Sequence, residues 1–319
     1  MILETFWKGK KVLITGHTGF KGTWLVIWLT MLGAKVYGYS LPPTSQSLFF
    51  SLGNNFKNKI SHHEANILEA QSLEEFVQES DPDIIFHLAA QPLVLKSYSE
   101  PIYTWQTNVI GSLNLLESAK KLKKKCALIM VTTDKVYENK EWIYSYREND
   151  PLGGHDPYSA SKAAAEIAIK SWRLSFSQSN LYIATARSGN VIGGGDWAEN
   201  RLIPDIVRAL ISHEKILIRN PHSTRPWQHV LEPLRGYMLL AQKLYKNPGQ
   251  YCEAFNFGPS SQNNKKVEDV INAVIKQWPG VWEVYKEDEN LHEANLLNLQ
   301  SDKSYKILNW ETKWGFDRT

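Results

Sequence analysis

Tyr158 and Lys162 are the two residues whose types and spacing point most directly to chemistry. Because they are four positions apart, both side chains would project from one face of a helix. A free tyrosine titrates near pH ~10, and a neighbouring positive charge lowers that pKa. The pair could therefore abstract a proton. A lone tyrosine and lysine at this spacing more often lie on an ordinary helix surface, so the rest of the chain must decide.

The element that must hold this pair is a helix beginning at Pro157. Asp156 is a suitable N-cap, and a proline fits the first helical position because its missing N–H would be unpaired there. The alanine-rich residues 163–169 then favour continuation of the helix. We therefore expect the tyrosine and the lysine to lie in the first turns of a stable helix.

A glycine-rich turn follows the first predicted strand, residues 12–14, and precedes a predicted helix over residues 21–32. Gly16 permits a tight turn, Gly19 lets the backbone approach a pyrophosphate, and Gly22 lets helix and strand pack closely. The N–H groups of the helix would point at the phosphates. A strand, a glycine turn and a helix in this order predict a dinucleotide site.

The second predicted strand, residues 35–39, leaves the choice of dinucleotide open. An acidic residue near its end would bind the adenosine ribose of NAD, and a basic residue would favour the 2′-phosphate of NADP. The chain has neither, because Ser40, Leu41 and two prolines follow the strand. The cofactor is therefore not decided at this position.

Strands and helices continue to alternate, which predicts an α/β fold with a Rossmann-like, doubly wound parallel sheet. Further strands are expected near residues 64–66, 83–88, 127–131 and 182–186, and helices over residues 72–79, 103–122 and 201–211. Ligand chemistry in such sheets lies at the carboxyl ends of the strands. Thr133, Asp134 and Lys135 occupy one of these ends. We expect His87, by contrast, to pack within its strand.

This interpretation divides the chain at about residue 188. Residues 1–188 would form the dinucleotide-binding domain. Residues 189–319 would form mainly a smaller, irregular C-terminal substrate lobe, with some return of the chain to the large domain. The lobe begins with a glycine-rich loop that is too long to be a simple turn.

Composition excludes several classes of protein. The 319 residues carry a net charge of +3, which is too small to indicate a nucleic-acid partner. Two cysteines give neither a disulfide framework nor a metal-binding spacing, so no metal is expected. The longest apolar run, residues 24–32, is about half a membrane span, and the N-terminus lacks a secretory pattern. We expect a soluble, cytoplasmic protein without a membrane partner.

Several motifs together resemble the extended short-chain dehydrogenase/reductases. They are the turn Gly16-His17-Thr18-Gly19-Phe20-Lys21-Gly22, the strand end Leu88-Ala89-Ala90, Asn108, and the pair Tyr158 and Lys162. The glycine turn and residues 133–139, 146–162, 190–197 and 225–230 are similar to the branch of that family that dehydrates CDP-glucose.

The resemblance implies an NAD-retaining 4,6-dehydratase that converts CDP-D-glucose to CDP-4-keto-6-deoxy-D-glucose. Tyr158 would take the proton of the sugar 4-hydroxyl while hydride leaves C4 for the nicotinamide. Lys162 would lower the tyrosine pKa, and Thr133 would hydrogen-bond the 4-oxygen. Asp134 would protonate the departing 6-hydroxyl before hydride returns to C6.

The resemblance also implies two sets of binding residues. The set for NAD is Gly16, His17, Thr18, Gly19, Phe20, Gly22, Asn66, Ile67, Leu88, Ala89, Ala90, Asn108, Tyr158 and Lys162. The set for the nucleotide sugar is Gln91, Asn190, Asp196, Trp197, Arg201, Arg225 and His229. We expect His17 to crowd the phosphate site and loosen NAD.

Three features depart from the family pattern. Lys135 stands where relatives that act on dTDP-sugars carry Glu, and a lysine can remove the C5 proton only if burial or neighbouring cations lower its pKa. Lys135 is therefore either that base or a residue that orients the substrate. Asn66 stands where many relatives have Asp near adenine. The chain ends at Thr319, where the family usually continues into a final helix.

Two alternatives stay open. Another nucleotide-sugar dehydratase or a 4-epimerase could use the same fold, although epimerisation needs no acid such as Asp134 at a 6-hydroxyl. A catalytically silent nucleotide-sugar-binding protein would have no reason to keep Thr133, Tyr158 and Lys162 together. Members of the family commonly pair through the helices that hold Asn108 and Tyr158, so a homodimer is expected.

Overall fold

A seven-stranded parallel sheet forms the centre of the structure, a computed structural model that describes residues 2–260, 264–285 and 296–319. In spatial order its strands are β11 (Ala254–Asn256), β6 (Leu181–Arg187), β5 (Cys126–Val131), β4 (Ile84–His87), β1 (Lys11–Thr15), β2 (Lys35–Ser40) and β3 (Ser61–Glu64). Each neighbouring pair runs parallel. The strand order reverses between β1 and β4, which confirms the predicted doubly wound sheet.

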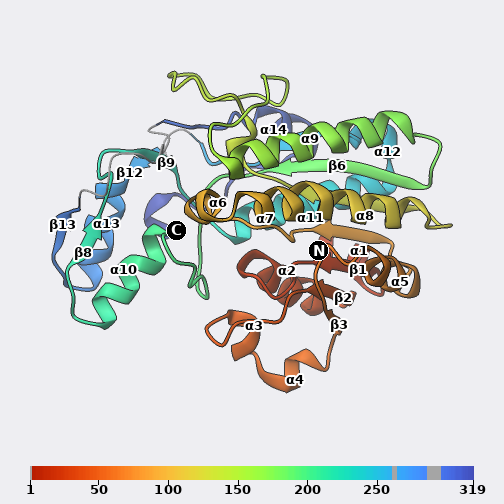
Figure 1. The fold of residues 1–319 in the computed structure, drawn as a ribbon, viewed down its shortest axis with the longest axis horizontal. Coiled ribbons are helices and arrows are strands. Elements are labelled where there is room, and N and C mark those ends of the chain that lie inside the picture. Colours follow the sequence, from red (N-terminus) through yellow and green to blue (C-terminus); the bar gives the residue numbers. More distant parts are fainter. Residues whose placement is uncertain (1, 261–263, 286–295) are drawn as a thin grey trace.

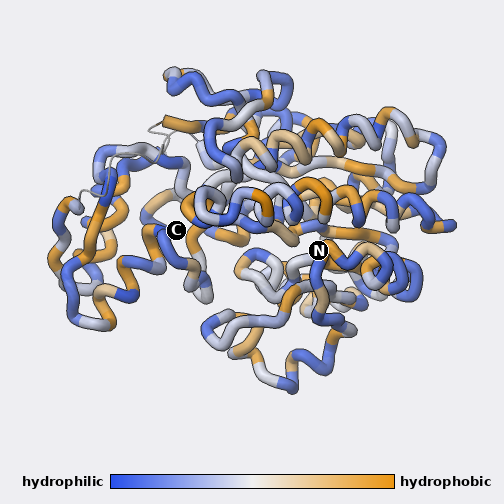
Figure 2. The backbone as a smooth tube through the Cα atoms, viewed as in Figure 1, coloured by the Kyte–Doolittle hydropathy of each residue, from blue (hydrophilic) through white to orange (hydrophobic). Residues whose placement is uncertain are grey.

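Helices cover both faces of this sheet (Figure 1). Successive residues of a strand face opposite sides, so Val12 and Ile14 of β1 belong to one apolar cluster and Leu13 to the other. The first cluster includes residues of α1 (Ile2–Trp7), α2 (Phe20–Met31) and α11 (Leu231–Lys246), and the second includes residues of α5 (Ala70–Ser80), α8 (Gly111–Lys120) and α9 (Pro157–Ser175). Hydrophobic stretches accordingly follow the strands and the sheet-facing helix turns (Figure 2).

The helix predicted over residues 103–122 is helical throughout most of its length but contains an irregular turn. α7 (Pro101–Trp105) passes into a π-helical turn, η1 (Gln106–Ile110), and then into α8. α6 (Val94–Ser99) precedes them. Such π turns occur often at functional sites, and this one contains the predicted site residue Asn108.

A second, smaller body of structure lies at one end of the sheet in Figure 1. It comprises α10 (Leu202–Ile211), β8 (Ile216–Ile218), α13 (Val267–Gln277) and β13 (Trp282–Val284), which enclose their own apolar cluster. Two short strand pairs connect it to the large domain: β7 (Val191–Ile192) with β10 (Gln228–His229), and β9 (Thr224–Pro226) with β12 (Asn264–Lys266). This arrangement places the smaller body beside the strand ends.

The chain returns to the large domain at residues 231–256, and again at residues 302–308 after α13 and β13. α11 packs on the sheet, β11 pairs with β6, and α14 (Asp302–Leu308) contacts β11. The remaining short helices are α3 (Leu48–Ser51), α4 (Gly53–Lys57), η2 (Asp134–Val136), α12 (Pro248–Tyr251) and η4 (Phe316–Arg318). Within the described ranges, no helix has the length and apolarity needed to cross a membrane.

Candidate active site

A cavity of about 1530 Å³ opens along the carboxyl ends of the sheet strands. Residues from the ends of β1, β2, β4, β5 and β6 line one side, and residues of α10 and β8 line another. A pocket for a single small ligand usually measures ~300–1,000 Å³, so this cavity has room for two ligands. Its position is the one at which doubly wound sheets bind ligands.

The glycine turn forms one wall of the cavity and matches the predicted dinucleotide cradle. Gly16 has a φ of +74°, and a Cβ atom there would lie 2.6 Å from the backbone nitrogen of Ala89. A Cβ atom on Gly22 would lie 2.1 Å from the carbonyl oxygen of Gly16. α2 begins at Phe20 without a side-chain cap, so its N-terminal N–H groups are available to an anion. The turn is therefore shaped for close approach of a pyrophosphate.

His17 does not crowd this cradle, so that prediction is wrong. Its ring is fully buried and lies edge-on to Phe49, with ring centroids 5.0 Å apart, and against Gly38 of β2. Because Gly38 has no side chain, the ring fits beneath β2 rather than toward the cavity. Burial, with His62 nearby, lowers the pKa of His17 to about 3, so the imidazole is neutral. The neighbouring Thr18, Gly19 and Phe20 do line the cavity.

The helix α9 holds the tyrosine and the lysine as predicted. Asp156 Oδ1 accepts a hydrogen bond from the backbone N–H of Ser159 at 2.9 Å, which confirms the N-cap, and Pro157 is the first helical residue. Tyr158 and Lys162 are both buried and line the cavity. Both can therefore reach a ligand bound there.

The pKa of Tyr158 is raised rather than lowered, contrary to expectation. Burial raises it to about 12, because a buried phenolate loses its hydration, while a hydrogen bond with Thr133 and the charge of Arg201 oppose this. Burial also lowers the pKa of Lys162 to about 8, opposed by Glu166. Burial therefore moves the two pKa values apart, and the phenol of Tyr158 is protonated at neutral pH.

Thr133, Asp134 and Lys135 follow β5 and line the cavity near Tyr158. Thr133 Oγ1 donates to Asp134 Oδ1 at 3.0 Å, and the backbone N–H of Asp134 donates to Ser188 O at 3.2 Å. Burial raises the pKa of Asp134, although the charge of Lys135 opposes it. A carboxyl group with a raised pKa can hold a proton for delivery, which suits a general acid.

Lys21 and Ser188 also line the cavity, although they were not among the residues predicted from the sequence. Lys21 Nζ donates to Ser188 Oγ at 2.8 Å, and Ser188 Oγ lies 2.5 Å from the hydroxyl of Tyr237. Burial, followed by the charge of Arg201, lowers the pKa of Lys21 to about 8. The available signal was a cationic residue inside the predicted glycine turn.

Most of the predicted nucleotide-sugar residues are brought together in the wall of the cavity. Asn190, Asp196, Trp197, Arg201 and Arg225 line the cavity. Arg201 Nη1 lies 3.0 Å from Asp196 Oδ2, and the side chain of Trp197 is 36% exposed, so it is not a core residue. Arg219, which the sequence did not indicate, also lines this wall.

Besides His17, three predicted contact residues do not line the cavity. Gln91, Asn108 and His229 lie behind its walls. Asn108 Oδ1 accepts from the backbone N–H of Gln91 at 2.9 Å, and Asn108 Nδ2 donates to Ser161 Oγ at 2.9 Å. These bonds fix the end of β4 to α9. The His229 ring packs at a tilt against Trp314, with ring centroids 4.7 Å apart.

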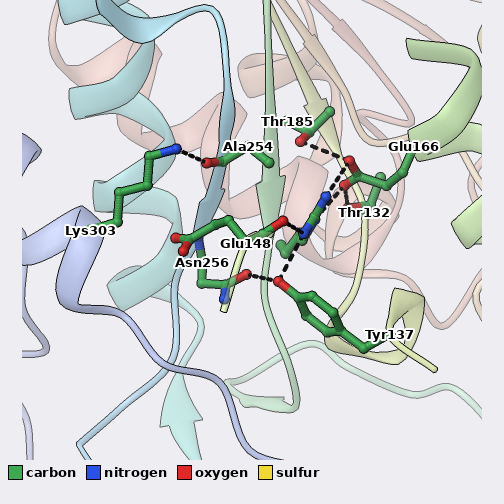
Figure 3. A network of polar contacts seen from close by, with 9 residues as sticks. Thr132, Tyr137, Glu148, Glu166, Thr185, Ala254, Asn256 and Lys303 are labelled. Carbon is green, nitrogen blue, oxygen red and sulfur yellow. Dashed lines mark hydrogen bonds and ion pairs between the residues drawn. The ribbon is translucent and has the colours of Figure 1, made fainter. Parts of the chain in front are cut away.

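A buried ion pair is the centre of a second polar network that involves α9 (Figure 3). Glu166, one helical turn after Lys162, accepts hydrogen bonds from Thr132 Oγ1 at 2.6 Å and Thr185 Oγ1 at 3.0 Å. Arg187 binds the same carboxylate through Nε at 2.9 Å and Nη2 at 2.8 Å. Arg187 also donates to the Tyr137 hydroxyl at 2.8 Å, so α9, β5 and β6 are held together.

Two further observations concern His87 and the possibility of a metal site. His87 is buried between Thr15 Oγ1, at 2.7 Å, and Ser112 Oγ, at 3.0 Å, which confirms that it packs within its strand. Among the residues described, no group of three or more His, Cys, Asp or Glu side chains could hold a metal ion. Separately, the cavity lining includes Asp134, Tyr158 and Lys162, which are residue types that take part in acid–base chemistry.

The sheet, the glycine turn and the buried tyrosine–lysine pair together define an extended short-chain dehydrogenase/reductase. The profile of the family described as GDP-mannose 4,6 dehydratase matches residues 13–319, and the chain belongs to that family. The predicted resemblance is confirmed. A CDP-glucose 4,6-dehydratase of Salmonella typhimurium is 45% identical over 327 residues, covering 100% of this chain and 90% of that protein.

This chain is also similar to more distant relatives and to solved structures. A dTDP-D-glucose 4,6-dehydratase of Dictyostelium discoideum is 29% identical, covering 83% of this chain and 62% of that protein. An epimerase from Methanothermobacter thermautotrophicus has a TM-score of 0.85 at 23% identity, covering 100% of this chain and 92% of that chain. The dTDP-glucose 4,6-dehydratase DesIV from Streptomyces venezuelae, solved with NAD and TYD bound, has a TM-score of 0.81 at 20% identity, covering 96% of this chain and 92% of that chain. Both solved structures share the fold of this chain.

Proposed function

We propose that this protein is an NAD-dependent hydro-lyase that converts CDP-D-glucose to CDP-4-keto-6-deoxy-D-glucose and water. The observation that carries the proposal is that Thr133, Asp134, Tyr158 and Lys162 are all buried around one cavity with room for two ligands. The 45% identity to a CDP-glucose 4,6-dehydratase supports the choice of substrate. We assign the product to deoxysugar biosynthesis, including that of lipopolysaccharide O-antigen.

The glycine cradle fits NAD. A side chain at Gly16 or Gly22 would meet backbone atoms of the protein, so only glycine permits the tight turn that this cradle requires. Ala89 and Ala90 would face the nicotinamide half, and Asn66 and Ile67 the adenine half. Bound there, NAD would supply the electron acceptor for carbon 4 of the sugar and the electron donor for carbon 6.

In the oxidation step, Tyr158 takes the proton of the sugar 4-hydroxyl, while Thr133 hydrogen-bonds the 4-oxygen. Because burial raises the pKa of Tyr158 to about 12, this proton transfer depends on positive charge held close by. Lys162 supplies that charge from the next turn of α9, where Glu166 favours its ammonium form. The helix therefore positions both the proton acceptor and its counter-charge.

In the elimination step, Asp134 gives its proton to the departing 6-hydroxyl, which leaves as water. The new ketone at carbon 4 acidifies the proton at carbon 5, and a base must remove it. Lys135 lines the cavity beside Asp134 and is the first candidate. If Lys135→Ala retained the wild-type rate of deuterium exchange at carbon 5, Lys135 would only orient the substrate.

The proposal is tested by incubating the protein with NAD and, separately, CDP-glucose, dTDP-glucose and UDP-glucose. A dehydratase gives a 4-keto sugar with its base-induced absorbance, and we expect the largest signal with CDP-glucose. A 4-epimerase would give the epimeric sugar without that absorbance, and a silent binding protein would give neither. Tyr158→Phe is the control, because it lacks the proton acceptor but keeps the ring.

We further propose a homodimer. The α7–α8 segment and α9 expose large apolar side chains, including Ile102 at 69%, Ile167 at 59% and Leu174 at 69%. A second copy of the chain could cover both surfaces at once. Light scattering should give twice the chain mass for the wild type and half that value for Ile167→Glu combined with Leu174→Glu, whereas a monomeric wild type would contradict the proposal.

We also propose that residues 1–188 bind NAD and that residues 189–319 mainly bind the nucleotide sugar. Asp196 and Arg225 belong to the second segment and line the same cavity as the glycine turn. Since the substrates would be NAD and a nucleotide sugar, we place the enzyme in the cytoplasm.

A further inference from the structure

The part of the cavity beyond the glycine turn is built from uncharged residues. Its described lining residues there are 39–44, 46, 47 and 65–67, and none is Asp, Glu, Lys or Arg. The charged lining residues belong instead to the catalytic and nucleotide-sugar side. In doubly wound folds this uncharged part receives the adenosine, and the residue at the end of the second strand meets its ribose.

Ser40 is that residue, and its hydroxyl is oriented by two hydrogen bonds. Thr18 Oγ1 lies 2.7 Å from Ser40 Oγ and donates to the carbonyl oxygen of Leu41 at 2.9 Å. A hydroxyl has only one proton to donate. The proton of Thr18 is used on Leu41, so Ser40 must be the donor in the contact with Thr18. The lone pairs of Ser40 Oγ are then left as acceptors at the cavity wall.

We propose that Ser40 Oγ accepts the hydrogen bond of the adenosine ribose 2′-hydroxyl, in place of the usual carboxylate. This inference rests on the proposed function, because it takes NAD as the dinucleotide. A neutral acceptor binds a hydroxyl more weakly than a carboxylate does. It also lacks the negative charge that would repel a 2′-phosphate. The chain should therefore bind NAD with modest affinity and discriminate only weakly against NADP.

Equilibrium binding to the full chain tests this assignment without reference to turnover. Dissociation constants are measured by tryptophan fluorescence or calorimetry for NAD, for NADP and for NAD that lacks the adenosine 2′-hydroxyl. We expect the missing hydroxyl to weaken binding to the wild type by about threefold to tenfold, the range of one neutral hydrogen bond. Ser40→Ala should bind NAD and the 2′-deoxy form equally. Ser40→Asp should tighten NAD and weaken NADP by about tenfold or more.

Ser47→Ala is the matched control at the same end of the cavity. The Ser47 hydroxyl is already engaged, because it donates to Thr44 O at 2.8 Å and accepts from the N–H of Phe50 at 3.2 Å. This variant should keep the wild-type penalty for the missing hydroxyl. The assignment is overturned if Ser40→Ala also keeps that penalty, or if Ser40→Asp leaves the ratio of NAD to NADP affinity unchanged. A wild type that binds no NAD would instead overturn the proposed function.

Discussion

The ion pair between Glu166 and Arg187 is the interaction whose loss we expect to weaken the protein most. Their side chains are only 3% and 4% exposed, and two nitrogens of Arg187 bind the two carboxylate oxygens at 2.8 and 2.9 Å. Arg187→Met removes the cation but keeps most of the side-chain volume. The carboxylate of Glu166 would then be buried without a counter-charge.

The expected loss can be worked out from this geometry. Breaking a buried ion pair by removing one partner costs about 3–5 kcal/mol of unfolding free energy. Thr132 and Thr185 would still donate to Glu166, which favours the lower half of that range. For 319 residues the unfolding entropy is roughly 0.7 kcal/mol per degree, so the midpoint of thermal unfolding should fall by about 4–6 °C.

The loss of unfolding free energy in Arg187→Met should be larger at pH 7 than at pH 5. Burial alone would raise the pKa of Glu166, but the charge and hydrogen bonds of Arg187 lower it overall. A pKa that is lower in the folded than in the unfolded state stabilises the protein above the unfolded value, ~4.5, and this stabilisation is lost as the pH falls through the folded value. Without Arg187 burial dominates, so the folded state would take up a proton. The difference between wild type and variant should therefore shrink between pH 7 and pH 5.

Urea unfolding of both proteins at pH 7 and pH 5 measures these quantities. The control is Lys121→Met, which removes an exposed partner of Glu74 at 2.7 Å and should change stability by less than about 1 kcal/mol. Glu166→Gln, alone and combined with Arg187→Met, completes a double-mutant cycle that isolates the pair. An Arg187→Met protein no less stable than the Lys121→Met control would refute the reasoning.

Three further predictions concern the site. Asp134→Asn should still oxidise carbon 4 but stall before loss of water, seen as reduced nicotinamide that accumulates without 4-keto product; unchanged dehydration would remove Asp134 from its role. Because burial lowers the pKa of Lys162 to about 8, its ammonium form is lost above that pH, and kcat/KM should fall as the pH rises through 8; a profile that stays flat well above pH 8 would contradict this. Gly22→Ala should weaken NAD binding at least tenfold in a binding assay, since its Cβ atom would lie 2.1 Å from Gly16 O; wild-type affinity would show that the turn can rearrange.

The fold could be predicted because its signals are local. Short apolar strands, glycine turns and capped helices each follow from a few neighbouring residues, and their alternation leaves few arrangements other than a doubly wound sheet. The N-cap Asp156 and the strand end at Thr133 were placed for the same reason. Their meeting at one cavity followed from the parallel sheet alone.

The missed features depend on contacts between distant segments. Lys21 and Ser188 are 167 residues apart, and the sequence near either residue does not predict the hydrogen bond between them. The direction of the His17 ring depends on the absence of a side chain at Gly38 of a neighbouring strand. The pKa of Tyr158 was predicted from a neighbouring cation, but burial by the whole site proved the larger effect.

The two halves of the proposed reaction share one buried carboxylate. Glu166 lies one turn beyond Lys162 on the helix that begins with the proton acceptor, and it holds the hydroxyl of Thr132 at 2.6 Å. Thr132 directly precedes the strand end that carries the proposed acid, Asp134. A shift of α9 relative to β5 must therefore break this contact before it can separate the oxidation residues from the elimination residues. Since a sugar carbon must be oxidised and then lose water without moving to another site, a rigid connection of this kind is what the chemistry requires.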